Sequence, residues 1–325
     1  MKASSLEAMV QKALEGHKLS TARLISIFED TRADAPLRRR AVLDELDKYQ
    51  TRRAKFIGIT GTPGAGKSSL IGELALRLVA QDPHARVAVL AIDPSSHVSG
   101  GALLGDRTRT NFPVGESRLY FRSQASDLEL GGVSRTTFPV CRLLDRLFDY
   151  VFVETVGVGQ SEIEIQQVAD FVFLVLTPLG GDQVQFLKAG IMEVPDAIVL
   201  NKCDAVEEAR RSYHALRGSL SLSRPGEEDR VRIYKTSVTE QIGLDNVSSF
   251  ILSLERDPLG RSMRRKELYF FGKWARDEFG RAGLRYLSSL GGAEALLEGQ
   301  HFEHAQAAFR EKVQEGIGSW LAEKS

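Results

Sequence analysis

FIGITGTPGAGKSSLIGELALRLVA, residues 56–80, decides the fold. Five residues rich in β-branched and aromatic side chains precede a glycine-rich turn, and apolar residues at helical spacing follow it, so the stretch predicts a strand, a loop and a helix. The turn matches G-x-x-x-x-G-K-[ST] from Gly61 to Ser68. Its glycines let consecutive backbone N–H groups converge on phosphate oxygens at the positive end of the helix. We therefore predict a loop that binds the phosphates of a nucleoside triphosphate.

Two side chains of this loop have chemical roles. Lys67 adds a mobile positive charge for the β- and γ-phosphates, so we expect it to be catalytic, and the Ser68 hydroxyl can ligate Mg²⁺. The loop residues predicted to contact the nucleotide are Gly61, Thr62, Pro63, Gly64, Ala65, Gly66, Lys67, Ser68 and Ser69.

The rest of the chain predicts a sheet between two helical segments. Several short β-rich runs are apolar at successive positions, which is typical of parallel strands covered on both faces. These further runs are 87–93, 119–123, 150–155, 171–177, 197–201 and 231–236. The expected fold class is α/β, a mostly parallel P-loop core with helical N-terminal and C-terminal extensions. The expected parts are an arm at 1–50, a P-loop domain at 51–256 and a helical tail at 257–325.

The tetrapeptide NKCD, residues 201–204, predicts the base. Guanine presents an N1–H and an exocyclic amine in one direction, and the Asp204 carboxylate can accept from both. Adenine lacks this pair of donors and would leave a buried carboxylate unsatisfied. Asn201 can tie this loop to the phosphate loop, and the stem of Lys202 can lie across the base. We therefore predict GTP and GDP as the ligands.

A second loop is expected beside the base. In KTSVT, residues 235–239, the backbone amides of Ser237 and Val238 can reach the base oxygen. The predicted base-binding residues are Asn201, Lys202, Asp204, Ser237, Val238 and Thr239.

Carboxylates at strand ends are candidates to hold the magnesium–phosphate pair, directly or through water. Asp93 closes one β-rich run, Asp106 lies in LLGDRTR, and Glu154 begins ETVGVGQSE. In that stretch, Gly157 could donate its N–H to the γ-phosphate, so that loss of the phosphate releases the loop. Most loops that sense a terminal phosphate begin with Asp, whereas this one begins with Glu154, and no Gln follows Gly157 directly. We therefore expect slow GTP hydrolysis without a partner. The catalytic candidates are Lys67, Asp93, Asp106, Glu154 and Gly157, and the metal candidates are Ser68, Asp93, Asp106 and Glu154.

Composition excludes several functions. Lys plus Arg and Asp plus Glu both number 43, so no charge excess indicates nucleic acid or anionic lipid as a partner. Two cysteines are too few for a disulfide framework or a zinc site. No apolar run is long enough for a membrane span and the start does not read as a secretory signal, so we expect a cytoplasmic protein.

The motifs together resemble the methylmalonyl-CoA mutase-associated G proteins, the MeaB/ArgK-like family that includes cobalamin A-type proteins. The matching pieces occur in order and cover most of residues 56–205; they are GTPGAGKSS, AIDPSS, SGGALLGDRTR, LGGVSR, VETVGVGQSE, GGDQVQFLKAGIMEVPD and NKCD. The resemblance implies a homodimeric GTPase that gates adenosylcobalamin loading and protection of a B12-dependent acyl-CoA mutase. The mutase substrate stays open among methylmalonyl-CoA, isobutyryl-CoA and 2-hydroxyisobutyryl-CoA. The cobalamin would lie on the partner, since this chain has no motif for it.

The resemblance also implies roles for two further segments. The loop 180–188 is a mobile switch facing the mutase in that family, which nominates Asp182, Gln185 and Lys188 as the partner switch. Composition alone leaves open whether the aromatic-rich tail packs on the sheet or forms a dimer surface, and the resemblance favours dimerisation through 257–325.

Two other functions compete with this interpretation. A nickel-insertion type of metallochaperone GTPase needs soft or imidazole ligands beside a switch, yet the six histidines are dispersed. A small-molecule kinase needs a phosphate acceptor pocket that the sequence does not reveal, and NKCD argues against ATP as its donor.

Overall fold

One parallel sheet organises the molecule. The computed structural model describes residues 3–32, 34–49, 52–93, 112–113, 115–125, 134–155, 161–178, 195–223, 231–255 and 260–323. The strands are β1 (Lys55–Gly61), β2 (Val87–Asp93), β3 (Leu119–Ala125), β4 (Tyr150–Thr155), β5 (Phe171–Leu176), β6 (Ala197–Leu200) and β7 (Arg232–Lys235). They form a seven-stranded sheet in the order β3-β2-β4-β1-β5-β6-β7, and every strand pair in it is parallel. The sequence-based prediction of an α/β fold with a parallel sheet is confirmed, strand by strand.

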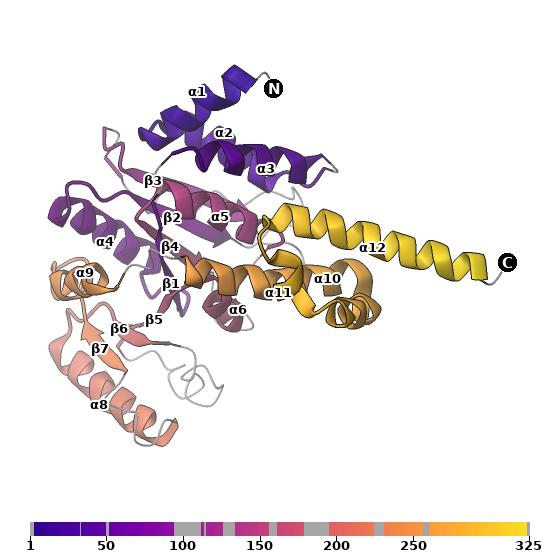
Figure 1. Ribbon diagram of the computed structural model, residues 1–325. Helices are drawn as coiled ribbons and strands as arrows, with labels where there is room; N and C mark the ends of the chain where they lie inside the picture. The colour runs from indigo at the N-terminus through magenta and orange to yellow at the C-terminus, as the bar shows by residue number, and fades with distance from the viewer. Residues whose placement is uncertain are drawn as a thin grey trace, which may run out of the picture.

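Helices precede, connect and follow the strands (Figure 1). Their bounds are α1 (Ala3–Leu14), α2 (Lys18–Glu29), α3 (Ala35–Leu46), α4 (Lys67–Gln81), α5 (Thr137–Leu147), α6 (Ser161–Val168), α8 (Val206–Ser223), α9 (Leu244–Ser253), α10 (Arg261–Ser289), α11 (Gly292–Leu297) and α12 (Phe302–Glu323). Within α10 the backbone leaves helical geometry at Gly280, whose φ is +65°. Among the described residues, no helix combines the length and the hydrophobicity needed to cross a lipid bilayer.

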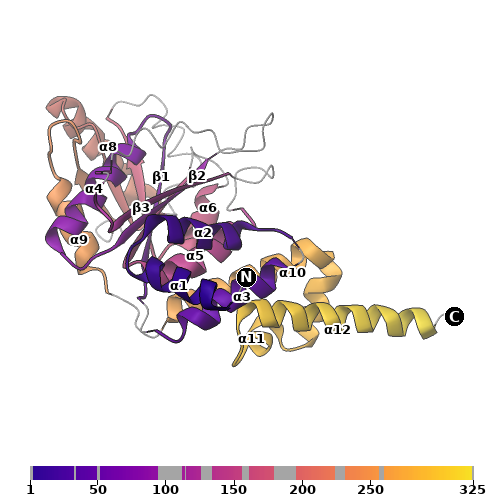
Figure 2. The same cartoon turned by 90° about the horizontal axis from the view of Figure 1, so that it is seen from above.

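The central strands are buried on both faces, which explains their successive apolar residues. Side chains alternate along a strand, so Phe56 of β1 and Val153 of β4 join one core cluster, while Ile57 of β1 and Phe152 of β4 join another. Helices α4 and α9 cover the second face, whereas α1, α2, α3, α5 and the tail helices share the first (Figure 2). A third cluster lies where α8 covers β5, β6 and β7.

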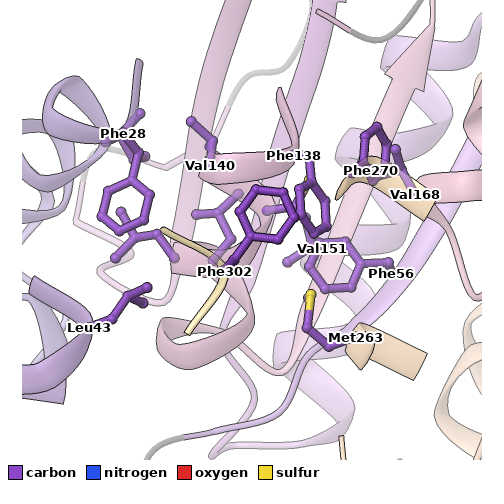
Figure 3. Close-up of a cluster of buried hydrophobic side chains, with 14 of the residues drawn as sticks. Phe28, Leu43, Phe56, Phe138, Val140, Val151, Val168, Met263, Phe270 and Phe302 are labelled. Atoms are coloured by element: carbon purple, nitrogen blue, oxygen red, sulfur yellow. The ribbon is translucent and has the colours of Figure 1, made fainter. Parts of the chain in front are cut away.

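The arm, the core and the tail share a single hydrophobic cluster (Figure 3). It includes Phe28 from α2, Phe138 from α5, Phe270 from α10 and Phe302 from α12. The rings of Phe138 and Phe270 stack with centroids 4.3 Å apart, and Phe138 meets Phe302 edge-on at 5.4 Å. The predicted boundaries near residues 50 and 256 therefore fall between segments that pack against one another, and their status as domain boundaries stays a prediction.

Buried ion pairs reinforce this contact. Arg142 of α5 is 6% exposed and donates from Nε to Glu267 of α10, 3.1 Å away, and from Nη1 to Glu303 of α12. Arg86, the residue before β2, donates to the Leu14 and Ala13 carbonyls at the end of α1, at 2.9 and 3.0 Å. We call the region where α3, α5, α10 and α12 meet around Arg142 the joint.

Candidate functional site

The phosphate loop lies at the carboxyl edge of the sheet, between β1 and α4. Gly61, with φ +140°, has no room for a side chain because a Cβ there would lie 2.0 Å from the Val175 carbonyl oxygen of β5. Gly66, with φ +84°, begins α4 as its N-cap, and a Cβ there would lie 2.7 Å from Asn201 Nδ2. Both positions require glycine on steric grounds as well as conformational ones. The loop geometry thus depends on close contacts with the neighbouring strand and with the base loop.

Lys67 is buried at the first position of α4. Its Nζ donates to the carbonyl oxygens of Gly61 and Thr62, at 2.9 and 3.1 Å, so the ammonium group lies across the mouth of the loop. This position, above a helix N-terminus and beside glycine amides, suits a cation that contacts terminal phosphates.

Ser68 and Glu154 meet at the same edge. The Ser68 hydroxyl donates to Glu154 Oε1 at 2.8 Å, and both side chains are buried. Glu154 belongs to β4, next to β1 in the sheet, so the carboxylate reaches the first turn of α4 from one strand away. A hydroxyl and a carboxylate brought together beside a phosphate loop are oxygen ligands of the kind that Mg²⁺ prefers.

A pair of hydroxyl groups links the ends of β1 and β4. Thr155 Oγ1, at the end of β4, donates to Thr60 Oγ1 of β1 at 3.1 Å, and both residues are buried. Thr60 precedes the phosphate loop, and Thr155 precedes the segment 156–160, so this contact holds the ends of the two strands together.

The base loop is tied to the phosphate loop by Asn201. Its Nδ2 donates to the Ala65 carbonyl at 2.9 Å, as predicted for this residue, while its Oδ1 accepts from Thr236 Oγ1 at 3.0 Å. Thr236 is fully buried and was not among the predicted site residues. Its position, directly after β7 and before Ser237, was the one available sequence signal.

Ser237 acts differently from the expectation. Its backbone amide donates to the Ile242 carbonyl at 3.0 Å, so in this structure the amide is engaged in a turn. Its hydroxyl instead donates to the Asp204 carboxylate and accepts from the Glu240 amide at 3.0 Å. Ser237 thus orients the carboxylate, which is exposed at the predicted base position together with Lys202. Val238 and Thr239 follow in the same turn.

Several predicted residues lie outside the described part of the chain. These are Asp106, Gly157, Asp182, Gln185 and Lys188. Asp93 ends β2, one residue beyond the Ile92–Thr155 pairing with β4, and its side chain is not described. Pro63, Gly64 and Ser69 are exposed at the loop and the first turn of α4.

Neither cysteine has the character of a nucleophile. Burial raises the pKa of the Cys141 thiol to about 12 and also raises the pKa of Cys203, whose Sγ donates to the Leu200 carbonyl. Cys203 therefore fills the variable position of NKCD as a small apolar residue. Among the described residues, His, Cys, Asp and Glu side chains form no cluster of three that could hold a metal ion.

A phosphate loop, an Asn-Lys-x-Asp base loop and a hydroxyl–carboxylate pair at one edge of a parallel sheet define a P-loop GTPase. The family model described as "Methylmalonyl Co-A mutase-associated GTPase MeaB" matches residues 21–266, and the chain belongs to this family. The predicted family membership and the predicted GTPase activity are thereby confirmed.

Named proteins show the same relationship. GTPase ArgK of Escherichia coli is 33% identical over 258 residues, which are 78% of this chain and 76% of that protein. The mitochondrial methylmalonic aciduria type A homolog of Caenorhabditis briggsae is 36% identical over 216 residues, 63% of this chain and 52% of that protein. A crystal structure titled "LAO/AO transport system kinase" superposes with a TM-score of 0.60 at 21% identity, covering 97% of this chain and 99% of that one, and it supports the fold.

Proposed function

We propose that this GTPase gates the loading of adenosylcobalamin onto a B12-dependent acyl-CoA mutase and protects the loaded enzyme. The family description names a mutase association, and the nematode relative carries the name of a methylmalonic aciduria protein. The observation that carries the proposal is that this family match, over residues 21–266, includes both nucleotide loops and the end of β4. Methylmalonyl-CoA, isobutyryl-CoA and 2-hydroxyisobutyryl-CoA mutases are the candidate partners.

At the nucleotide, each role is assigned to a residue of this chain. Lys67 would contact the β- and γ-phosphates, while Ser68 and Glu154 would hold Mg²⁺, which supplies charge neutralisation on the phosphate oxygens. The 2.8 Å contact between these two side chains supports this assignment. Asp93 and Asp106 are further candidates for the metal, and Gly157 for the γ-phosphate.

At the base, Asp204 would accept from guanine, with Ser237 fixing the carboxylate and Lys202 lying across the ring. The Asn201 bond to Ala65 would hold the base loop at a fixed distance from the phosphates. Val238 and Thr239 would complete this side of the site.

The signal to the partner would start at the end of β4. The Thr155–Thr60 contact supports a coupling between the phosphate loop and the segment 156–160, because a shift of either threonine moves the other. Asp182, Gln185 and Lys188 would form the surface that the mutase contacts.

We further infer a homodimer through the tail. Both Figure 1 and Figure 2 show α12 running out from the rest of the molecule, and residues 311–316 are mostly exposed. A second copy could pack on this helix. The cytoplasmic location expected from the sequence stays a prediction.

The test combines turnover with cofactor transfer. GTP hydrolysis by the purified chain should be slow alone, well below about ten per second, and should rise when one of the three mutases is added. With that mutase, adenosylcobalamin loading should require GTP and should fail with the Lys67→Ala variant. GTP hydrolysis and cofactor loading that are both indifferent to every mutase would contradict the proposal.

A further inference from the structure

A cavity opens at the joint, remote in the chain from both nucleotide loops. Its volume is about 200 Å³, and its walls come from the α2–α3 turn, the start of α5, α10 and α12. Four aromatic side chains line it, Phe138, Phe270, Trp274 and Phe302, among polar and charged residues. Because a water molecule occupies about 30 Å³ of liquid, the space exceeds what a single bridging water would fill.

Most charged groups around the cavity already have partners. Arg310 pairs with Glu278 at 3.1 Å and lies over the Trp274 ring, and Lys273 pairs with Glu164 at 2.7 Å. These pairs neutralise the charges of Arg310 and Lys273, and Arg310 covers one face of the Trp274 ring. The cavity therefore does not suit a simple organic cation.

Glu303 is the first exception. Its side chain lines the cavity and is 4% exposed, and Arg142 satisfies one of its oxygens, Oε1. The other oxygen, Oε2, is buried without a hydrogen-bond donor from any described residue. A buried carboxylate oxygen in this condition calls for a donor from a ligand, and an ammonium group is the strongest one.

Arg39 is the second exception. Its Nη2 donates to the Asp30 backbone carbonyl, and its Nε is buried without a partner within the described part of the chain. No described carboxylate forms an ion pair with it, and burial lowers the pKa of its guanidinium. The charge of Glu303, which also lines the cavity, acts on Arg39 without a direct bond. Such a guanidinium suits a ligand carboxylate.

We propose that the cavity at the joint binds a free α-amino acid with an apolar side chain. The ligand ammonium group contacts Glu303 Oε2, its carboxylate contacts Arg39, and its side chain lies among Phe138, Phe270 and Phe302. An α-amino acid carries one donor and one acceptor group on a single apolar body, which matches one unpartnered carboxylate oxygen, one guanidinium without an ion pair and four aromatic side chains around the cavity. Since the site spans arm, core and tail, occupancy stabilises their contact.

Calorimetry on the full chain tests this with four probes: L-phenylalanine, L-leucine, 3-phenylpropanoate and phenethylamine. We expect saturable binding of an amino acid with one site per chain at about 1 mM or below. 3-Phenylpropanoate lacks the ammonium group and phenethylamine lacks the carboxylate, so each should bind about tenfold or more weakly.

Two variants assign the contacts. Glu303→Gln should weaken L-phenylalanine about tenfold and leave 3-phenylpropanoate unchanged, while Arg39→Met should weaken L-phenylalanine and leave phenethylamine unchanged. Glu298→Gln and Arg23→Met, at exposed positions, are the matched controls. If Glu303→Gln fails to fold, the binding measurements on Arg39→Met, at a half-buried position, decide alone. Absence of saturable amino-acid binding to the wild-type chain, or binding that Arg39→Met leaves unchanged, would overturn the proposal.

Discussion

The carboxyl edge of the sheet and the joint use polar groups in opposite ways. At the carboxyl edge, short contacts among loop residues shape a surface for a ligand: Lys67 lies on loop carbonyls, and Asn201 ties two loops together. At the joint, the buried Arg142 binds carboxylates from α10 and α12, and so connects the tail to the core. Substitutions at the carboxyl edge should therefore change nucleotide binding or turnover with little effect on the free energy of unfolding. Substitutions at the joint should do the reverse.

Arg142→Met should give the largest effect. It leaves the Glu267 and Glu303 carboxylates facing an apolar side chain, and breaking a buried ion pair costs about 3–5 kcal/mol. The free energy of unfolding from denaturant titration should fall by this amount, while GDP affinity of the folded fraction should not change. Arg210→Met, which removes an exposed pair with Glu207, is the control and should leave unfolding unchanged. A loss of GDP affinity in folded Arg142→Met would break the contrast between the two regions.

Lys67→Ala should lower GTP turnover and leave stability nearly unchanged. Removing a charge positioned for the transferring phosphoryl group is expected to lower the GTP turnover number by about 10²–10³-fold. The denaturation midpoint should stay close to that of the wild type, because the hydrogen bonds from the ammonium group to the Gly61 and Thr62 carbonyls lie within the loop. Lys12→Ala, on the exposed side of α1, is the control. Turnover within a factor of a few of the wild type would remove Lys67 from the catalytic role.

Asp204→Asn should change the choice of base. The amide keeps the shape but offers one acceptor in place of two charged oxygens, so GDP affinity should fall by about 10–100-fold while ADP affinity stays unchanged. Equilibrium titration with fluorescent nucleotides measures both. Asp245→Asn, in the exposed first turn of α9, is a matched substitution outside the site. Equal losses for GDP and ADP would show that Asp204 does not read the base.

Thr236→Val should give the smallest effect. It removes the donor to Asn201 Oδ1 without changing the volume much, and a neutral hydrogen bond contributes about 0.5–1.5 kcal/mol. GDP affinity should therefore fall by about 2–10-fold, because Asn201 loses one of its two anchors. Ser219→Ala, which removes a surface hydroxyl from α8, should change nothing. A full loss of GDP binding would mean that Thr236 contacts the nucleotide itself.

The sequence predicted the carboxyl edge far better than the joint, and the reason is physical. The phosphate loop and NKCD are local backbone shapes, so residue type and spacing within ten positions determine them. The link from Asn201 to the phosphate loop was also predictable, because its function requires it. The amide of Ser237 was assigned to the base, yet it closes a turn with Ile242, which depends on how the chain leaves β7.

The joint could not be predicted because its contacts are distant in the chain. Arg142 bonds to residues 125 and 161 positions away, and no periodicity marks such partners. The aromatic residues of the tail were recognised, but the sequence left open whether they pack on the sheet or form a dimer surface. The structure places Phe270 against Phe138, while the exposed distal part of α12 leaves dimerisation as a proposal.

The affinity of this chain for its mutase in two nucleotide states tests the central claim most directly. The dissociation constant should be measured with a non-hydrolysable GTP analogue and with GDP, using the same purified mutase at the same Mg²⁺ concentration. We predict a difference of about tenfold or more, which corresponds to a coupling free energy of about 1.4 kcal/mol. Equal dissociation constants in the two states would contradict the account, because a partner cannot then read the terminal phosphate.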